Sequence, residues 1–454
     1  MTKQMHLKNL GFSPDSIWGD KNETVVYAQV FGVRLGSVPI FRFYRNPRQS
    51  PKSLANRIIN FYHDINIHDD ALSFPNRAAM RSAIWSSIAT VWSRCATDPN
   101  AFTPGTVIDL SSDDKEGFIC DLVPPADSAL TIDITKVDLL KSLGRRGCTK
   151  GAHVRIPAGT SINCFFKGID FATYLQFHDD DNEIIRSMVE TWRRSSKLVA
   201  DMPPHPNIQP LPEMIVSIRD SNGNEVLMGH LSTLYKQGDL ALVIEKANSG
   251  KTQILLKDKA GWCYEMSRVV AHTHRFLHTF HMDINPGNFL VRPWGELLLI
   301  DWEQSGAPAT TLAPEADGTW DVNEEATDEG TRLVYSKYTG PPRCNMPKGS
   351  EPATFHSWNV FPEWQATFPR ATELAEVFSL GRTMWMLLTQ TVGGFDEVKH
   401  PNDVRVTWDV KHNIPPHWIE MVERCMEKDP NERPHMEDLV KFWKLEESLL
   451  DRKP

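Results

Sequence analysis

The hydrophobic pattern of the first part of the chain predicts a folded segment that contains both strands and helices. Residues Thr24–Val33 and Pro39–Tyr44 have strand-like patterns, and Leu54–Tyr62 has a helical pattern. Farther along, apolar residues fall on one helical stripe: Met80, Ile84, Trp85, Ile88, Val91, Trp92 and Cys95. Because such a stripe packs against another element, residues 1–130 are expected to form a folded α/β extension.

The remainder of the chain is predicted to be rich in strands at first and then rich in helices. Strands are expected within residues 131–240, one of them over Leu227–Tyr235. An amphipathic helix is predicted between Trp262 and Phe280. Residues Glu376–Leu388 are apolar on nearly every side, which predicts a buried helix.

Two short apolar runs surround the turn signal Pro293-Trp294-Gly295 and predict a β-hairpin. Such a hairpin would fold Asn288, before the first run, back beside Asp301, after the second. Amide and carboxylate oxygens are ligands for a hard cation such as Mg²⁺. Asp283 would then lie at the edge of the same site, where it could accept the proton of an attacking hydroxyl.

The set Asp283, Asn288 and Asp301 resembles the catalytic core of the eukaryotic protein-kinase superfamily, whose pattern is H-R-D-x-x-x-x-N followed by D-F-G. Further matches are Ala313-Pro314-Glu315, Trp418, Cys425, Asp429-Pro430 and Arg433-Pro434. The resemblance covers about residues 131–454 and is strongest to the divergent protein-kinase-like proteins of filamentous fungi. It implies a buried ion pair between Arg433 and Glu315.

The resemblance implies an α+β, bilobal protein-kinase-like fold that follows the α/β extension at 1–130. Residues 131–240 would form the small β-rich N-lobe and residues 241–454 the large helical C-lobe, with a polar insertion at about 316–372. In this scheme Asp283 orients and deprotonates the acceptor hydroxyl, and Asn288 and Asp301 hold magnesium. ATP and Mg²⁺ are the expected cofactors.

The resemblance also suggests nucleotide-binding residues in the small lobe. Lys167 closes a short apolar strand, where kinases place the lysine that grips the α- and β-phosphates. Gly144 and Gly147 lie where the glycine-rich loop would be, although their spacing does not match G-x-G-x-x-G and equally fits a simple turn. The partner of Lys167 is expected to be Glu190, with Glu183 as the alternative, on a helix before the turn His205–Ile208.

Several residues depart from the family pattern. Met282 replaces an Arg that receives a phosphorylated activation loop, so activation by that route is not expected. Asn285, assigned to the catalytic set, replaces a Lys that neutralises the transferred phosphoryl group. Trp302-Glu303 replaces Phe-Gly, which removes backbone freedom. The polar insertion is expected to be a solvated loop, and a relocated substrate platform is the alternative.

Composition limits the cellular locations and the classes of partner that are expected. The formal charge of −9 over 454 residues argues against a sequence-independent nucleic-acid binder. Seven dispersed cysteines fit reduced thiols, and neither a secretory signal nor a membrane-span-length apolar run is evident. An intracellular protein, cytoplasmic or nuclear, is expected, without membrane or nucleic-acid partners.

The leading function is therefore an ATP- and Mg²⁺-dependent kinase that acts on Ser/Thr of a protein substrate. Two alternatives stay open. Pro286-Gly287-Asn288 also occurs in small-molecule phosphotransferases of the aminoglycoside and choline type. Asn285 and the degenerate glycine loop instead fit a nucleotide-binding pseudokinase that works as a scaffold.

Overall fold

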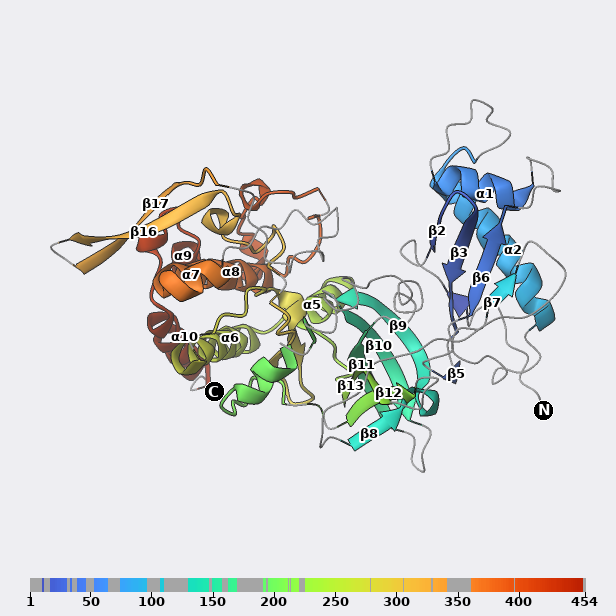
Figure 1. The fold of residues 1–454 in the computed structure, drawn as a ribbon. Coiled ribbons are helices and arrows are strands. Elements are labelled where there is room, and N and C mark those ends of the chain that lie inside the picture. Colours follow the sequence, from blue (N-terminus) through green and yellow to red (C-terminus); the bar gives the residue numbers. More distant parts are fainter. Residues whose placement is uncertain are drawn as a thin grey trace. The chain divides into compact units, whose positions relative to one another are not determined.

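The computed structural model divides into two compact units. Unit 1 comprises residues 1–192 and 212–234, and unit 2 comprises 193–211 and 235–454. The structure describes residues 10–451 apart from the gaps 12–16, 31–32, 35–38, 46–52, 64–73, 96–106, 110–129, 147–148, 157–161, 170–190, 193–194, 211, 213, 220–224, 278, 305, 328–329, 341–360 and 396. The described elements are mixed α and β, which is compatible with a kinase-like fold (Figure 1).

The first part of unit 1 is a small sheet packed on two helices (Figure 1). The sheet has the order β2-β3-β6-β7, and a separate pair joins β1 to β4. Ser53 caps α1 by accepting a hydrogen bond from the Asn56 backbone N–H, at 3.4 Å. The elements are β1 (Leu10–Gly11), β2 (Ile17–Gly19), β3 (Glu23–Tyr27), β4 (Gln29–Val30), β6 (Ile40–Tyr44), β7 (Val107–Asp109), α1 (Leu54–Tyr62) and α2 (Arg77–Cys95).

Three of the four predicted elements in this part are confirmed. The helix Leu54–Tyr62 is α1, Pro39–Tyr44 contains β6, and α2 carries the apolar stripe, with Met80, Ile84 and Ile88 buried. The predicted strand Thr24–Val33 is wrong as a single element. The chain leaves β3 after Tyr27, and the residues beyond it join β4 and then β5, which belong to two other sheets.

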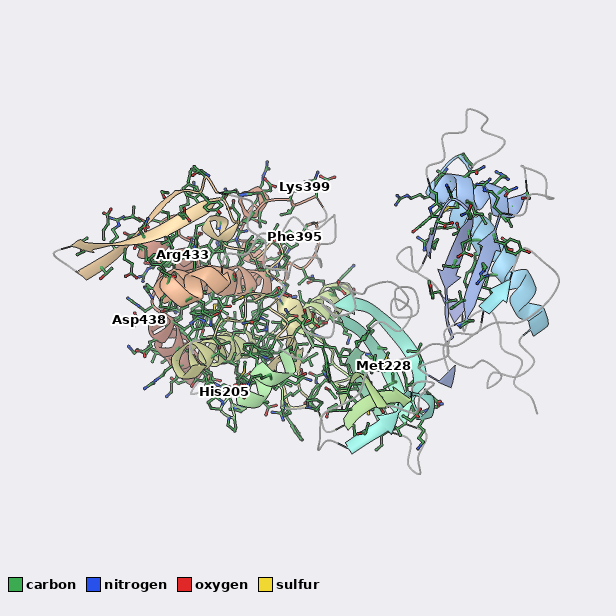
Figure 2. All side chains as sticks on the ribbon, viewed as in Figure 1. His205, Met228, Phe395, Lys399, Arg433 and Asp438 are labelled. Carbon is green, nitrogen blue, oxygen red and sulfur yellow. The ribbon has the colours of Figure 1, made fainter. Side chains whose placement is uncertain are left out.

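The second part of unit 1 is a seven-stranded sheet of order β5-β9-β10-β11-β13-β12-β8, as the predicted strand-rich character required. Its buried side chains, including Met228, form one core (Figure 2). Gly168 and Gly229 bring β11 and β13 close together, since a Cβ on Gly168 would lie 2.2 Å from the Met228 carbonyl oxygen. The strands are β5 (Val33–Arg34), β8 (Leu130–Asp133), β9 (Asp138–Arg146), β10 (Thr149–Ile156), β11 (Ile162–Gly168), β12 (Met214–Arg219) and β13 (Glu225–Thr233).

Unit 2 is built around a helix that is buried along its length. Every residue of α8 from Ala371 to Leu388 is buried except Glu373, which confirms the predicted buried helix. The predicted amphipathic helix is α6, and the predicted hairpin is β14–β15. The elements are α5 (Leu240–Ser249), α6 (Leu256–Leu277), β14 (Phe289–Val291), β15 (Leu297–Leu299), β16 (Trp320–Thr327), β17 (Gly330–Lys337), α7 (Phe361–Thr367), α8 (Pro369–Leu388), α9 (Pro416–Cys425) and α10 (Met436–Asp451). Among the described residues, no helix combines the length and apolar character needed to cross a bilayer.

The turn His205–Ile208 is hydrogen-bonded to the hairpin β14–β15 of the same unit. Leu299 donates its backbone N–H to the Asn207 carbonyl at 2.7 Å, and the Asn207 side-chain amide donates to the Leu297 carbonyl at 2.7 Å. Arg268 of α6 in turn donates to the Asn207 amide oxygen at 2.8 Å. Asn207 therefore links a segment far away in sequence to the strand that precedes Asp301.

Acidification is expected to weaken this turn through His205. Burial, with neighbouring His272 and Arg268, lowers the pKa of His205 to about 4 from the ordinary 6.5. Because the unfolded chain takes up this proton first, the stabilisation is complete above pH 6.5 and is lost as pH falls toward 4. Between pH 7 and pH 5, the melting temperature of the wild type should therefore fall more than that of His205→Asn.

Asn is the matched replacement because its amide oxygen can still accept the Asn207 N–H, which His205 Nδ1 accepts at 3.1 Å. Other histidines with lowered pKa, such as His63 and His412, contribute equally to both proteins. Identical pH dependence of the two melting temperatures would contradict this account of His205.

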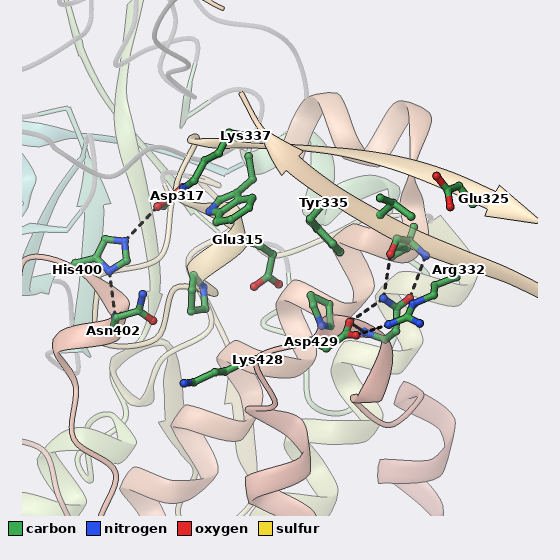
Figure 3. Close-up of a pocket in the computed structure, with 16 residues that line it drawn as sticks. Glu315, Asp317, Glu325, Arg332, Tyr335, Lys337, His400, Asn402, Lys428 and Asp429 are labelled. Atoms are coloured by element: carbon green, nitrogen blue, oxygen red, sulfur yellow. Dashed lines mark hydrogen bonds and ion pairs between the residues drawn. The ribbon is translucent and has the colours of Figure 1, made fainter. Parts of the chain in front are cut away.

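The expectation of a solvated loop over the whole insertion at 316–372 is wrong. Residues Trp320–Lys337 form the antiparallel hairpin β16–β17, and Phe361–Thr367 form α7. The hairpin forms because Val322 and Leu333 are buried in a cluster with Trp364 of α7. A groove of about 600 Å³ lies beside the hairpin, lined also by the loops near His400 and Asp429 (Figure 3).

Candidate active site

The hairpin β14–β15 brings the predicted metal ligands together, as the sequence pattern required. Phe289 pairs with Leu299 and Val291 with Leu297. At the open end, the Ile300 backbone N–H donates to the Asn288 carbonyl at 3.0 Å. Asn288 and Asp301 therefore leave neighbouring strands at the same end of the hairpin.

His281 fixes the loop before the hairpin. Its side chain is fully buried; its Nδ1 accepts the Asp283 backbone N–H at 3.3 Å, and its Nε2 lies 2.8 Å from the Ile300 carbonyl. Because Nδ1 accepts, the proton must lie on Nε2, which then donates to Ile300. The Trp302 ring packs edge-on against this imidazole at 4.6 Å. One histidine thus joins the backbone of Asp283 to that of Ile300, the residue after β15.

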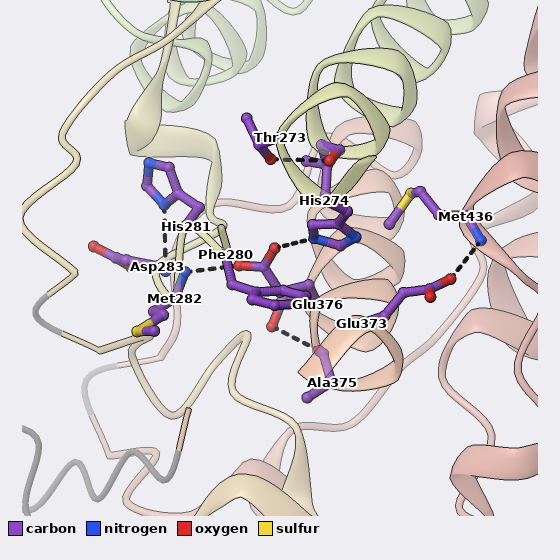
Figure 4. A network of polar contacts seen from close by, with 12 residues as sticks. Thr273, His274, Phe280, His281, Met282, Asp283, Glu373, Ala375, Glu376 and Met436 are labelled. Carbon is purple, nitrogen blue, oxygen red and sulfur yellow. Dashed lines mark hydrogen bonds and ion pairs between the residues drawn. The ribbon is translucent and has the colours of Figure 1, made fainter. Parts of the chain in front are cut away.

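Glu376 holds the same loop from the other side (Figure 4). Met282 has a φ of +65°, a conformation that costs about 1–3 kcal/mol outside glycine and therefore needs support. The Met282 N–H donates to Glu376 Oε1 at 2.7 Å, and His274 Nε2 lies 2.6 Å from Glu376 Oε2. Glu376 is 1% exposed, so both of its oxygens need these partners.

The Asp283 carboxylate lies between two amide side chains. Asn285 Nδ2 donates to Asp283 Oδ1 at 2.6 Å, and Asn288 Nδ2 donates to Asp283 Oδ2 at 2.9 Å. Asn288 also donates to the Asp283 carbonyl at 2.8 Å. The Asn285 amide oxygen accepts the Gly287 N–H at 2.8 Å and caps the turn Pro286–Asn288. The arrangement fixes the orientation of the Asp283 carboxylate.

The donor set at the end of the hairpin fits a hard cation. Since the Asn288 nitrogen donates to Asp283, its amide oxygen is the atom it can offer to a metal. Asp301, two residues after the end of β15, has a φ of +68° and adds a half-buried carboxylate. The described residues contain no cluster of three or more His, Cys, Asp or Glu suited to a metal. Two oxygen ligands suit Mg²⁺, which keeps several waters and whose coordination shell is completed by substrate phosphates.

The predicted nucleotide-binding residues belong to unit 1, where the structure describes Lys167 and Gly144. Lys167 lies on β11, opposite Gly151 of β10 and His230 of β13. Gly144 lies within β9, in the hairpin that β9 makes with β10. Gly147, Glu183 and Glu190 fall outside the described residues. The assignments of all these residues to ATP remain predictions.

The predicted ion pair between Arg433 and Glu315 is confirmed. Arg433 Nη1 and Nη2 donate to the two carboxylate oxygens of Glu315 at 2.5 and 3.0 Å. Arg433 also donates to the carbonyls of Leu374 and Glu427 at 3.0 and 2.9 Å. The pair therefore joins the turn Pro314–Ala316 to α8 and to the loop before α10.

Sequence reasoning did not find His274. Glu303, which replaces the Gly of the family pattern, is buried, at 1% exposed. His274 lies near the end of a predicted amphipathic helix. Many histidines without a functional role occupy such positions, so the sequence alone did not single it out. The informative signal was Glu376, a charged residue at the start of a mostly apolar run.

Comparison with known proteins gives a distant similarity to a protein kinase. A 192-residue segment is 27% identical to mitogen-activated protein kinase kinase kinase 7 from Homo sapiens, Bos taurus and Mus musculus. The aligned segment covers 40% of this chain, which spans about a quarter of the length of these relatives. No protein-family model matches the sequence. The similarity indicates a protein-kinase-like relationship.

Proposed function

We propose that this protein is an ATP- and Mg²⁺-dependent kinase that transfers the γ-phosphoryl group to a Ser/Thr hydroxyl of a protein. The observation that carries the proposal is the Asp283 carboxylate, held by Asn285 and Asn288 next to the hairpin end from which Asp301 extends. A fixed carboxylate beside a pair of hard-cation ligands is what hydroxyl phosphorylation needs. The similarity to relatives named as protein kinases supports a protein acceptor.

In this proposal each residue has one task. Asp283 accepts the hydrogen bond of the acceptor hydroxyl and orients it, while Asn285 and Asn288 hold the carboxylate. Asn288 and Asp301 would hold Mg²⁺, which when bound neutralises phosphate charge. Lys167 would position the phosphates, with Gly144 and Gly147 near them and Glu190 as its partner. Asn285 donates to Asp283 and carries no charge, which favours slow turnover.

The proposed function includes the bilobal arrangement, with lobes at 131–240 and 241–454 that follow the extension at 1–130. It also includes an intracellular location, cytoplasmic or nuclear, without membrane or nucleic-acid partners. Activation by loop phosphorylation is not expected, because the Met282 side chain is buried and carries no charge to receive a phosphate.

A nucleotide-binding scaffold is the second candidate, and one observation favours it. Both oxygens of Asp283 already accept hydrogen bonds from amides, and the Lys of the family pattern is replaced by Asn285. Transfer of labelled phosphate from γ-³²P-ATP to generic protein acceptors separates the candidates. Transfer that depends on Mg²⁺ supports the kinase, whereas ATP binding without transfer to any acceptor supports the scaffold.

Asp301→Ala is expected to abolish the Mg²⁺-dependent part of the stabilisation by ATP. The variant removes the only charged ligand that we assign to the cation, while the hairpin hydrogen bonds remain. Ligand at 100 times its dissociation constant stabilises a protein by roughly 2.7 kcal/mol, which a thermal-shift assay resolves. The measurement compares melting temperatures with ATP, with and without Mg²⁺.

Asp409→Ala is the control, because Asp409 pairs with Lys411 at the surface of the same unit. It should keep the full Mg²⁺-dependent shift. If Asp301→Ala also keeps that shift, Asp301 does not bind the metal.

A further inference from the structure

The hairpin β16–β17 has an anchored base and an exposed end. At the base, Val322 and Leu333 are buried in the same cluster as Met282 and Ala313. Beyond the base, residues 323–327 of β16 are exposed, and the turn end extends past the helices of unit 2 (Figure 1). The base of the hairpin is therefore part of the packing that surrounds Met282, the residue before Asp283.

The contacts of Leu333 show which backbone groups face outward. Leu333 donates its N–H to Asn431 Oδ1 and accepts from Asn431 Nδ2, both at 3.0 Å, so its backbone points away from β16. Its cross-strand partner is Glu324, so this is a non-hydrogen-bonded pair of the antiparallel ladder. The backbone groups of Glu324, and by the two-residue period those of Val322 and Ala326, point to the outer edge of β16.

The two edges of the hairpin differ. Asn431 closes the edge of β17 at Leu333. Within the described part of the chain, β16 pairs with β17 alone. The outer edge of β16 therefore presents the N–H and C=O groups that another extended chain could pair with.

The β16 strand and the residues just before it carry only negative charge, while Arg332 of β17 lies opposite Glu325 in the register. Positions 314–331 contain no Lys or Arg and seven acidic residues: Glu315, Asp317, Asp321, Glu324, Glu325, Asp328 and Glu329. Glu315 is paired with Arg433, and Asp317 lies 3.1 Å from His400. Glu324 and Glu325 are exposed and form no ion pair with any described residue. Since Arg332 is paired with Asp429, an extended chain at this edge would meet the negative charge of Glu324 and Glu325.

The groove at the base is lined by side chains of both signs (Figure 3). Lys337 Nζ lies 3.7 Å from the centre of the Trp320 ring, which is a cation–π contact. Trp320 and Lys337 both line the groove of about 600 Å³. Since Arg332, Lys337 and Lys428 line the groove together with acidic side chains, the preference for positive charge comes from the exposed end of β16 and not from the groove.

We propose that the outer edge of β16 binds an extended basic segment of the protein acceptor by strand addition. The inference rests on the proposed function, for which it names the class of substrate: hydroxyl acceptors in chains rich in Lys and Arg. Backbone pairing with Val322, Glu324 and Ala326 provides the register, and the acidic side chains provide the preference for basic residues.

The first experiment tests the charge. Two peptides of about 14 residues each carry one Ser, flanked at alternate positions by Arg in one and by Glu in the other. We expect Glu324→Lys/Glu325→Lys to raise KM for the Arg peptide about tenfold and to leave kcat within about twofold, because each exposed charge contributes modestly. Glu420→Lys/Glu427→Lys is the control, since it changes the net charge equally at exposed positions of unit 2.

The second experiment tests the strand edge. Ala326→Pro removes an outward N–H of β16 without removing a hydrogen bond between β16 and β17. Thr331→Pro is its mirror control, because Thr331 pairs with Ala326 and its N–H faces the other edge. We expect Ala326→Pro to raise the Kd for the Arg peptide several-fold, because one hydrogen bond to the peptide is lost. Thr331→Pro should leave the Kd for the Arg peptide unchanged.

Fluorescence anisotropy of the labelled peptides gives Kd without catalysis. If no peptide is phosphorylated but the Arg peptide binds and its Kd responds to these substitutions as expected, the docking proposal stands and the kinase proposal fails.

If the hairpin and control charge variants bind the Arg peptide equally, the acidic residues only protect an exposed strand edge and the docking proposal is overturned. Equal effects of the two prolines would overturn strand addition. Melting temperatures confirm folding, and Glu324→Gln/Glu325→Gln replaces any charge variant that does not fold.

Discussion

Replacing Asp283 with Asn is expected to lower kcat for phosphoryl transfer by about 10²–10⁴-fold, the range of general acid–base catalysis. Affinity for ATP should change by no more than a few fold, because the proposed partner of Asp283 is the acceptor hydroxyl. The measurement is a pair of assays on one protein preparation: labelled phosphate transfer for kcat and the ATP thermal shift for binding.

The structure also predicts what the Asn replacement does locally. Two amide nitrogens, from Asn285 and Asn288, point at the two oxygens of Asp283. Asn offers a single acceptor oxygen, so one of these hydrogen bonds must be lost. Asn288 keeps its bond to the backbone carbonyl of residue 283, which holds its amide in place for the metal. Catalysis should therefore be lost while the Mg²⁺-dependent thermal shift remains.

The control is Asp409→Asn, at an exposed carboxylate of the same unit, which should leave both measurements unchanged. Equal loss of ATP binding and turnover in Asp283→Asn would mean that Asp283 serves the nucleotide. Unchanged turnover would remove it from the catalytic set altogether.

The parts of the fold that depend on short-range patterns were predictable from the sequence. The helix Leu54–Tyr62, the hairpin around Pro293-Trp294-Gly295 and the buried helix over Glu376–Leu388 each have a period or a turn signal within the element itself. The hairpin was decisive for the candidate site, because the pairing of Phe289 with Leu299 alone brings Asn288 near Asp301. The Arg433–Glu315 pair followed from family resemblance, since no local pattern joins residues so far apart.

Elements that depend on distant packing were not predictable. The hairpin β16–β17 was expected to be a solvated loop because its exposed end is polar, and only two positions, Val322 and Leu333, bury apolar side chains. The attachment of Asn207 to β15 uses hydrogen bonds to Leu297 and Leu299, about 90 residues away. His274 belongs to the site only because α8 places Glu376 beside it. Sequence periodicity carries no information about such partners.

Breaking the Arg433–Glu315 pair should cause a large loss of stability in unit 2. Arg433→Met is expected to lower the free energy of unfolding by roughly 3–5 kcal/mol, because it leaves the buried Glu315 carboxylate without its partner. Chemical denaturation of the purified variant measures this loss. Arg332→Met is the control: its pair with Asp429 is exposed, at 55% and 37%, and should contribute less than about 1 kcal/mol.

Restoring the charge balance should recover part of this stability and not all of it. In Arg433→Met/Glu315→Leu no buried charge is left alone, and such apolar replacements are often tolerated. Arg433 also donates to the carbonyls of Leu374 and Glu427, however, and the double variant leaves these acceptors unpaired. Each unpaired carbonyl costs about 1–3 kcal/mol, so the stability of the double variant should lie between that of Arg433→Met and that of the wild type.

A double variant no more stable than Arg433→Met would mean that the two carbonyl contacts dominate. A single variant as stable as the wild type would mean that Glu315 is readily neutralised where it lies. In either case the side chain that closes the turn Pro314–Ala316 onto α8 would not be acting through its charge.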